Sequence, residues 1–155
     1  MALLALAFCI GIVAGLRTFT APMLVSWAAR LGLLQLDGTW AVFLGYGWTP
    51  WILTLLAAGE LVVDKLPTTP SRKTPPQFIG RIVTGSFSGA TIATASDNAL
   101  TGLVAGAVGA VAGTLAGAAL RGHLVKATGG RDFPIALIED AVAVIGGAIL
   151  LKLYL

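Results

Sequence analysis

The sequence predicts an all-α protein, a polytopic bundle of five or six transmembrane helices. Three observations predict it: 57% of the 155 residues are hydrophobic, only 11% are charged, and the mean hydropathy is +0.91. Soluble domains are about 45–50% apolar and about 25% charged. A chain this short and this apolar must cover its hydrophobic surface with lipid rather than with its own polar surface. We therefore expect one transmembrane domain over residues 1–155 and exclude a soluble globular enzyme.

Six apolar runs follow one another along the chain, and each is a candidate membrane span. They cover residues 2–16, 21–36, 48–66, 78–95, 100–120 and 134–155. A spanning helix needs about 20 residues, so the last four runs qualify by length, whereas the first two are short. These two form either one long helix that breaks within the membrane at Arg17 or two short helices joined at its surface.

The basic residues favour six spans over five. Cytoplasmic loops of membrane proteins carry an excess of Lys and Arg. Six spans with both termini outside leave only Arg30 and Lys152 on the outer side. The other eight bases then lie on the inner side: Arg17, Lys65, Arg72, Lys73, Arg81, Arg121, Lys126 and Arg131. Four tryptophans near the ends of the second and third runs fit an aromatic belt on the outer side.

Six spans divide into two halves of opposite orientation, residues 1–76 and 77–155. Glycines precede a polar break in each half, at 11–15 and 85–89, and the third run of each half carries two acids. Inverted three-helix repeats recur in secondary transporters. Two inverted three-helix repeats are therefore one interpretation, and chance similarity in a chain with 20 glycines is the other.

The fifth run carries a stripe of glycines along one helix face. Its members recur at intervals of three or four residues: Gly102, Gly106, Gly109, Gly113 and Gly117. Small residues let helix backbones approach closely in lipid, where hydrophobic burial between helices gives no drive. The stripe predicts tight packing within one bundle, a seam between copies of the chain, or the lining of a permeation path. In so small a bundle we also expect a homo-oligomer.

Four acids fall inside apolar runs, where a charge costs at least about 2.5–3.5 kcal/mol and so tends to face the bundle interior and pair. Glu60 and Asp64 are four residues apart and share a helix face. Glu139 and Asp140 lie about two turns into the last run, also toward the inner side in the six-span arrangement. Together with Arg17 these acids predict a binding site for an ion or small charged solute. Structural salt bridges are the alternative.

A second set of residues predicts a site for an anion or a lipid phosphate. Arg17 precedes a helix start, with Thr20 as the expected N-cap and Pro22 in the first turn. The free amides of a helix start, together with Arg17, are suited to hold a phosphate, a lipid headgroup or one of the carboxylates above. Arg72, in the proline-rich stretch 66–76, and Arg81 complete the set. For that stretch a rigid connector is the alternative.

Three sequence runs together resemble a bacterial membrane family that carries only a domain-of-unknown-function label, four-one-two-six. They read GLRTFTAP at 15–22, GELVVDKLPTTPSR at 59–72 and EDA at 139–141. The likeness spans most of the chain, and the middle run is its most specific part. It implies a small multi-pass protein of the bacterial inner membrane and transfers no catalytic residue.

The sequence thus predicts a small transporter or channel in which the intramembrane acids form a proton, cation or substrate site. One alternative is a membrane enzyme that acts on lipid headgroups through a divalent metal held by Glu60, Asp64 and Asp140. Another is a structural or accessory protein whose charges are all paired. We find no catalytic triad, phosphate-binding glycine loop or dinucleotide fingerprint, so we expect no cofactor and favour a non-enzyme. Expected partners are membrane lipids and the solute, not nucleic acid.

Overall fold

The computed structural model describes residues 1–66 and 71–155, and every regular element within them is helical. The prediction of an all-α protein is therefore confirmed for these residues, whereas residues 67–70 of the predicted proline-rich connector lie outside them. The elements are α1 (Ala2–Leu16), α2 (Thr20–Arg30), the 3-10 turn η1 (Val42–Gly45), α3 (Thr49–Val63), α4 (Pro75–Thr94), α5 (Ala99–Ala127), α6 (Asp132–Ala141), the π-helical segment η2 (Val142–Gly146) and α7 (Gly147–Tyr154). The last three form one continuous helix. Six helices thus correspond to the six apolar runs.

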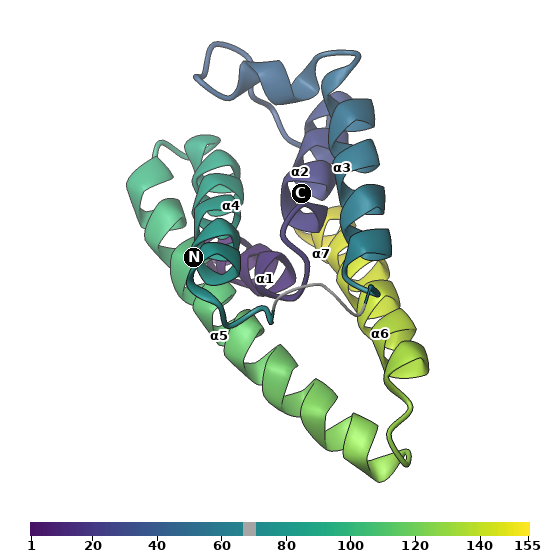
Figure 1. Cartoon of the computed structure of the whole chain (residues 1–155). Helices are drawn as coiled ribbons and strands as arrows, with labels where there is room; N and C mark the ends of the chain where they lie inside the picture. The colour runs from purple at the N-terminus through teal and green to yellow at the C-terminus, as the bar shows by residue number, and fades with distance from the viewer. Residues whose placement is uncertain (67–70) are drawn as a thin grey trace.

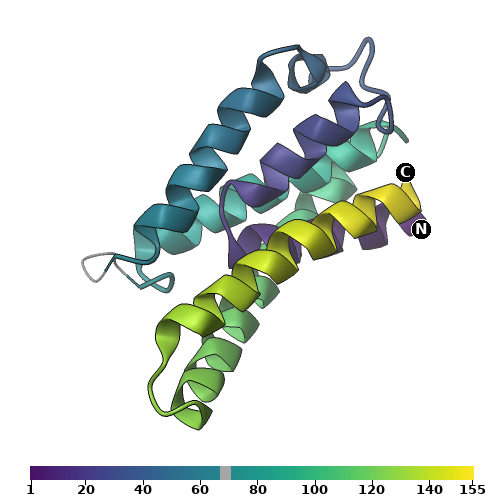
Figure 2. The ribbon, with the colours of Figure 1, turned by 90° about the vertical axis from the view of Figure 1, so that its right-hand side faces the viewer.

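Consecutive helices run in opposite directions, so that both chain termini lie at the same end of the bundle (Figure 2). We call this the terminal end. The other end, the polar end, holds the turn between α1 and α2, the end of α3 and the start of α4. At the polar end α5 and α6 extend well beyond the other helices (Figure 1). Because α1 and α2 reverse direction, the interpretation of one long broken helix is wrong.

The reversal between α1 and α2 follows from the residues at the turn. Pro22 has no amide hydrogen, and its ring would clash with the carbonyl four residues earlier, so a continuous helix cannot pass through residues 18–22. Arg17 accordingly has an extended backbone (φ −141°, ψ 118°), and the residue at the N-cap of α2 is Phe19. The expectation that Thr20 caps α2 is wrong. Thr20 is the first helical residue, and its hydroxyl is buried without a hydrogen bond to any described residue.

The glycine stripe of α5 packs against α1 and α4 of the same chain. A Cβ on Gly106 would lie 2.9 Å from the carbonyl carbon of Gly85 and 3.2 Å from Cα of Gly89, both in α4. A Cβ on Gly113 would lie 2.9 Å from Cα of Ile12 in α1. Such distances leave no room for any side chain. The glycine stripe therefore allows close packing of helices within one bundle. This packing joins α1 to the second half of the chain.

The bundle has an apolar core, but its outer faces and two buried arginines differ from those of a typical water-soluble bundle. Large apolar side chains are exposed along the outer faces, among them Leu55 (74%), Leu100 (74%) and Leu153 (73%). Arg17 (0%) and Arg81 (2%) are buried instead. Among the described residues, α5 and the continuous helix Asp132–Tyr154 are the two helices long and apolar enough to cross a membrane.

Candidate functional site

Ten charged side chains meet at the polar end of the bundle and form one network of ion pairs, which we call the polar cluster. They come from the α1–α2 turn and from α3, α4, α5 and α6, together with the segments that join them. Five are basic and five are acidic, so the cluster has no net charge. Its members are Arg17, Glu60, Asp64, Lys65, Arg72, Arg81, Arg121, Asp132, Glu139 and Asp140.

Arg17 lies at the centre of the polar cluster and has no solvent exposure. Its Nε donates to Oδ1 of Asp140 at 2.6 Å, and its Nη1 donates to Oδ2 of Asp64. Nη2 lies 2.6 Å from the same Asp140 oxygen and 3.6 Å from Oε2 of Glu139, without hydrogen-bond geometry to either. One guanidinium therefore links acids of α3 and α6 to the α1–α2 turn.

The two acids of α6 are each shared between bases from different segments. Lys65 Nζ donates to Oδ2 of Asp140 at 2.5 Å and to the carbonyl of Leu61 at 2.8 Å. Arg72 binds both oxygens of Glu139, at 2.5 and 2.8 Å. Bidentate pairs of this kind are the strongest and most directional of charged hydrogen bonds. They fix α6 against the start of α4 and the end of α3.

Arg121 and Asp132 extend the polar cluster beyond the residues that we predicted. Arg121 binds both oxygens of Asp132 at 2.8 Å and reaches Oε2 of Glu139 at 3.3 Å. In the sequence these two residues are eleven positions apart, across the loop between two apolar runs, and no local pattern joins them. The pair forms because α5 and α6 are antiparallel neighbours beyond the rest of the bundle.

Charged side chains hold both helix ends at the α1–α2 turn. The Glu60 carboxylate accepts hydrogen bonds from the amides of Thr18, at 2.6 Å, and Phe19, at 2.8 Å. Arg81 Nη1 donates to the carbonyls of Gly15, at 3.0 Å, and Leu16, at 2.7 Å. An acid thus faces the positive end of the α2 dipole and a base faces the negative end of the α1 dipole. The anion expected at this helix start is the protein's own Glu60.

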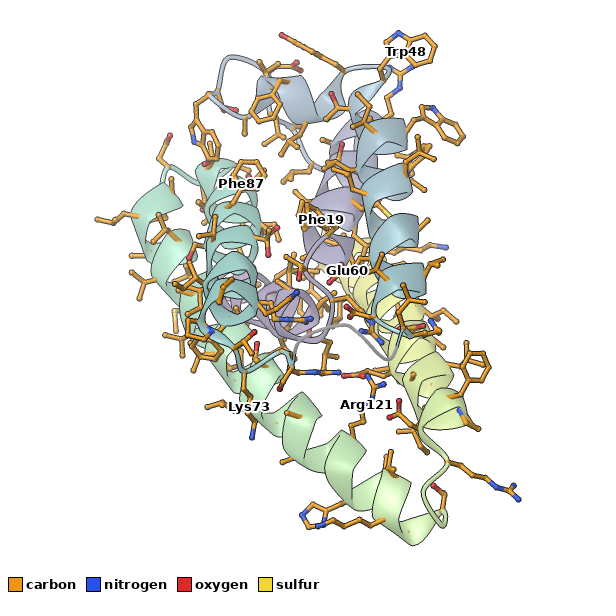
Figure 3. The ribbon with its side chains drawn as sticks, viewed as in Figure 1. Phe19, Trp48, Glu60, Lys73, Phe87 and Arg121 are labelled. Carbon is orange, nitrogen blue, oxygen red and sulfur yellow. The ribbon has the colours of Figure 1, made fainter. Side chains whose placement is uncertain are left out.

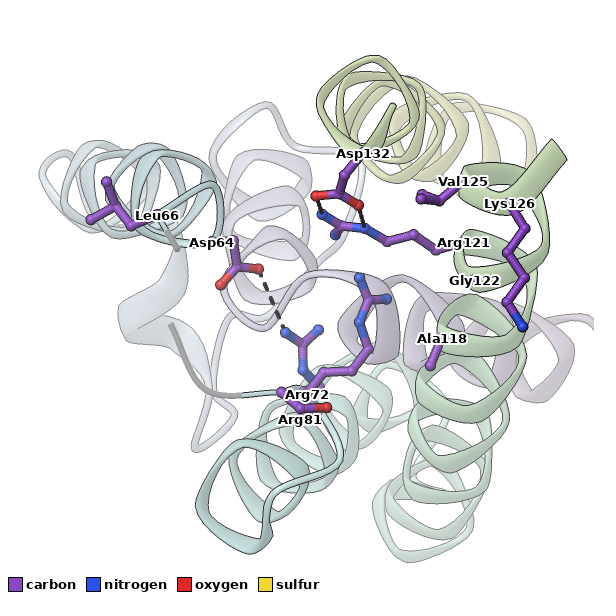
Figure 4. A pocket seen from close by; sticks show the side chains of 11 residues that line it. Asp64, Leu66, Arg72, Arg81, Ala118, Arg121, Gly122, Val125, Lys126 and Asp132 are labelled. Atoms are coloured by element: carbon purple, nitrogen blue, oxygen red, sulfur yellow. Dashed lines mark hydrogen bonds and ion pairs between the residues drawn. The ribbon is translucent and has the colours of Figure 1, made fainter. Parts of the chain in front are cut away.

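Two cavities border the polar cluster, and both are lined by Asp64. The larger, of about 550 Å³, is lined by four basic and two acidic side chains, and we call it the basic cavity. Its charged residues are Arg72, Arg81, Arg121, Lys126, Asp64 and Asp132 (Figure 4). The smaller, of about 370 Å³, lies between α3 and the start of α4 and is lined by Phe19 and Glu60 among others. Glu60, Asp64 and Asp132 are thus paired and also line a cavity, whereas Glu139 and Asp140 line neither of the two.

The structure brings most of the predicted site residues together. Arg17 contacts both predicted acid pairs, and Arg72 and Arg81 join the same cluster, whereas Thr20 makes no hydrogen bond there. The three acids proposed as metal ligands do not converge. In residues 1–66 and 71–155 no three His, Cys, Asp or Glu side chains lie close enough to hold a metal ion.

Fold and site together define a helical bundle with a buried, charge-balanced cluster at one end. The chain matches the family model described as Domain of unknown function (DUF4126) over residues 4–153. It therefore belongs to this family, as the sequence runs around Arg17, Glu60 and Glu139 indicate. Searches of curated proteins and of solved structures return no match.

Proposed function

We propose that the protein is a multi-pass protein of the bacterial inner membrane and moves a small charged solute through the polar cluster. The observation that carries the proposal is the cluster itself: ten paired charges meet at one end of an apolar bundle and border two cavities. Placing a charge within a membrane costs free energy, so ionisable side chains inside membrane bundles are candidates for functional residues.

The lengths and surfaces of the helices support the membrane placement. The 29 residues of α5 are about 43 Å long at about 1.5 Å per residue, against a hydrocarbon core of about 30 Å. With the start of α5 at the outer boundary, the inner boundary falls near Leu120. The polar cluster then lies at the inner boundary, on the side that the eight basic residues favour. Trp48 is exposed at the opposite end, as expected of an outer aromatic belt (Figure 3).

The sharing of partners within the polar cluster supports movement of a charged solute. Glu139 is within reach of three bases, and Asp64 is within reach of Arg17 and Arg81. A solute charge can replace one partner while another remains, which avoids the several kcal/mol that a buried unpaired charge costs. Helix ends also face the binding site in many secondary transporters, as the α1–α2 turn does here. The π-helical segment begins two residues after Asp140, and such segments are frequent at functional sites.

A structural or accessory role is the second candidate, and the neutrality of the polar cluster favours it. All five acids of the cluster have basic partners, as a purely structural network requires. This role predicts that loss of one partner lowers stability and that no solute crosses the membrane. The metal-dependent lipid enzyme gains no comparable support, because Glu60 is bound to backbone amides and Asp64 and Asp140 are bound to Arg17.

Flux into proteoliposomes tests the proposal. Wild type is compared with Glu139→Gln, and with Lys152→Gln as a matched control, since Lys152 is exposed in α7 and lies outside the polar cluster. Gradients of pH, sodium, potassium and phosphate are imposed in turn. We expect flux that Glu139→Gln lowers at least about tenfold and that Lys152→Gln leaves unchanged.

Two results would count against the proposal in different ways. Equal flux in wild type and Glu139→Gln would place the route outside the polar cluster. No flux above that of empty liposomes under any gradient, with folded protein, would remove transport of these ions and favour the structural role.

A further inference from the structure

We propose that the basic cavity binds an oxyanion of the phosphate type, with Arg81 as its main hydrogen-bond donor. The inference rests on the proposed function, because it takes the polar end to be the inner membrane face, and it names the chemical class of the solute. The phosphate group belongs either to a free solute or to the headgroup of a membrane lipid.

The charge of the basic cavity favours an anion. Four basic and two acidic side chains line it, and both acids already hold a base by hydrogen bonds. Asp132 binds Arg121, and Asp64 binds Arg17, which does not line the cavity. Figure 4 shows the guanidinium groups of the cavity directed into the space between α3, α5 and α6. Arg72 in turn binds Glu139, which does not line the cavity, so the charges of the polar cluster cancel and Lys126 leaves an excess of one positive charge, which favours an anion.

Arg81 has free donors on one edge of its guanidinium. Nη1 is occupied by the carbonyls that end α1, whereas Nε is buried without a hydrogen bond to any described residue. Nη2 likewise makes no hydrogen bond in the described part of the chain, and the nearest carboxylate oxygens are 3.7 Å away on Asp64 and 3.9 Å away on Glu60. Nη2 is therefore the donor of Arg81 that an oxyanion in the cavity can reach, whereas Nε is enclosed by protein.

The two acids nearest to Arg81 form their hydrogen bonds with other groups. Both oxygens of Glu60 accept hydrogen bonds from backbone amides of the α1–α2 turn. A buried donor without a partner destabilises the folded protein, and a bound oxyanion would supply the missing acceptor. Arg81 is only 2% exposed, so this cost is not relieved at an open surface.

The position of the cavity fits a phosphate. Its residues on α5 run from Ala118 to Lys126, at and beyond the inner boundary of the hydrocarbon core. This is the level of lipid phosphates and is also open to the aqueous phase. Lys126 stands at the mouth and makes no ion pair with the described residues, so it adds attraction without being tied to an acid. A volume of about 550 Å³ holds a phosphate group with its water or with a small headgroup.

Binding to protein in phosphatidylcholine nanodiscs tests the inference with inorganic phosphate as the probe and chloride at equal ionic strength as its reference. We expect saturable phosphate binding that Arg81→Gln weakens at least about tenfold and Lys126→Gln weakens a few fold. Arg131→Gln is the matched control, because Arg131 is exposed at the same end but does not line the cavity. Its affinity is expected to equal that of wild type.

A second arm separates the two sources of phosphate. Nanodiscs that also contain phosphatidic acid are compared with phosphatidylcholine alone by the thermal stability of the protein. Stabilisation by phosphatidic acid that needs Arg81, without binding of inorganic phosphate, identifies a lipid headgroup as the ligand. The inference is overturned if neither probe exceeds chloride, or if the Arg81 variant binds as wild type does.

Arg81→Gln also removes the hydrogen bonds to the end of α1. If this variant does not fold, a second variant decides the question. Lys126→Glu reverses an exposed charge at the mouth and is expected to weaken phosphate binding at least about tenfold in folded protein. Equal affinity in this variant overturns the inference. Phosphate binding without flux would contradict only the transport proposal, whereas flux of a cation that phosphate does not affect would contradict only the oxyanion site.

Discussion

Replacement of Arg17 by methionine is the sharpest test of the polar cluster as a packed electrostatic unit. The substitution keeps an unbranched apolar stem and removes the group that, among the described residues, binds both Asp64 and Asp140. Asp140 retains Lys65 at 2.5 Å, but Asp64 is left with Arg81 at 3.7 Å. The loss therefore falls mainly on Asp64.

The magnitude follows from two opposing terms. At an effective dielectric constant of about 20, two unit charges about 4 Å apart attract by about 4 kcal/mol, so the two contacts of Arg17 give about 8 kcal/mol. Removal of a buried guanidinium from water costs several kcal/mol, which offsets about half of this attraction. We expect Arg17→Met to lower the free energy of unfolding by about 3–5 kcal/mol. The double variant Arg17→Met, Asp64→Asn removes the unpaired acid as well and should regain about 2 kcal/mol.

Reversible unfolding in mixed detergent micelles, followed by circular dichroism, measures these differences. Lys152→Met is the control, because Lys152 is exposed and lies outside the polar cluster, and it should change the stability by less than about 0.5 kcal/mol. A loss below about 1 kcal/mol for Arg17→Met would refute the reasoning. So would a double variant that is as unstable as the sum of the two single variants.

Three further predictions concern packing, the α1–α2 turn and topology. Gly106→Ala should lower the free energy of unfolding by at least about 2 kcal/mol in the same unfolding assay, because the new Cβ meets backbone atoms. Gly122→Ala on the same helix is the control. A Cβ there has nothing within 4 Å, so this variant should be neutral or stabilise the protein by about 0.5–1 kcal/mol. Glu60→Gln should cost about 1–2 kcal/mol, since the amide keeps one acceptor but loses the charge at the helix start; no loss would contradict the capping role. In a background without the native cysteine, thiols at Lys126→Cys and Asp37→Cys should react with a membrane-impermeant reagent from opposite sides of the cell membrane, and labelling from one side would contradict six spans.

Local patterns in the sequence predicted the helices and most members of the polar cluster, because those patterns act over one or two helical turns. The six apolar runs became six helices, and the spacing of Glu60 and Asp64 put both carboxylates within ion-pair distance of Arg81. The cost of a charge in lipid selected the acids before any partner was known. The spacing of the glycines likewise predicted a close approach of helices.

The choice of partners could not be predicted, because it depends on how helices rotate and cross. A carboxylate was one of the occupants predicted for the start of α2, but the sequence did not indicate that Glu60 would be the acid that binds these backbone amides. Arg121 and Asp132 pair because α5 and α6 extend past the other helices. The same holds for the stripe of α5, which packs against the preceding helix α4 and also against α1, which is distant in the sequence.

The bundle combines two kinds of contact that differ in how easily they rearrange. Helices α1, α4 and α5 meet backbone to backbone at glycines, where even a methyl group has no room, so this unit is rigid. Helix α3 buries only Pro50 and Ala57, and its polar end is held by the charged contacts of Glu60, Asp64 and the adjoining Lys65. Ion pairs can exchange partners without leaving a void, whereas interlocked backbones cannot. If part of the bundle moves during a transport cycle, the contacts therefore leave α3 as the part that is free to move. Asp64 lines both cavities and is the residue that would change partners.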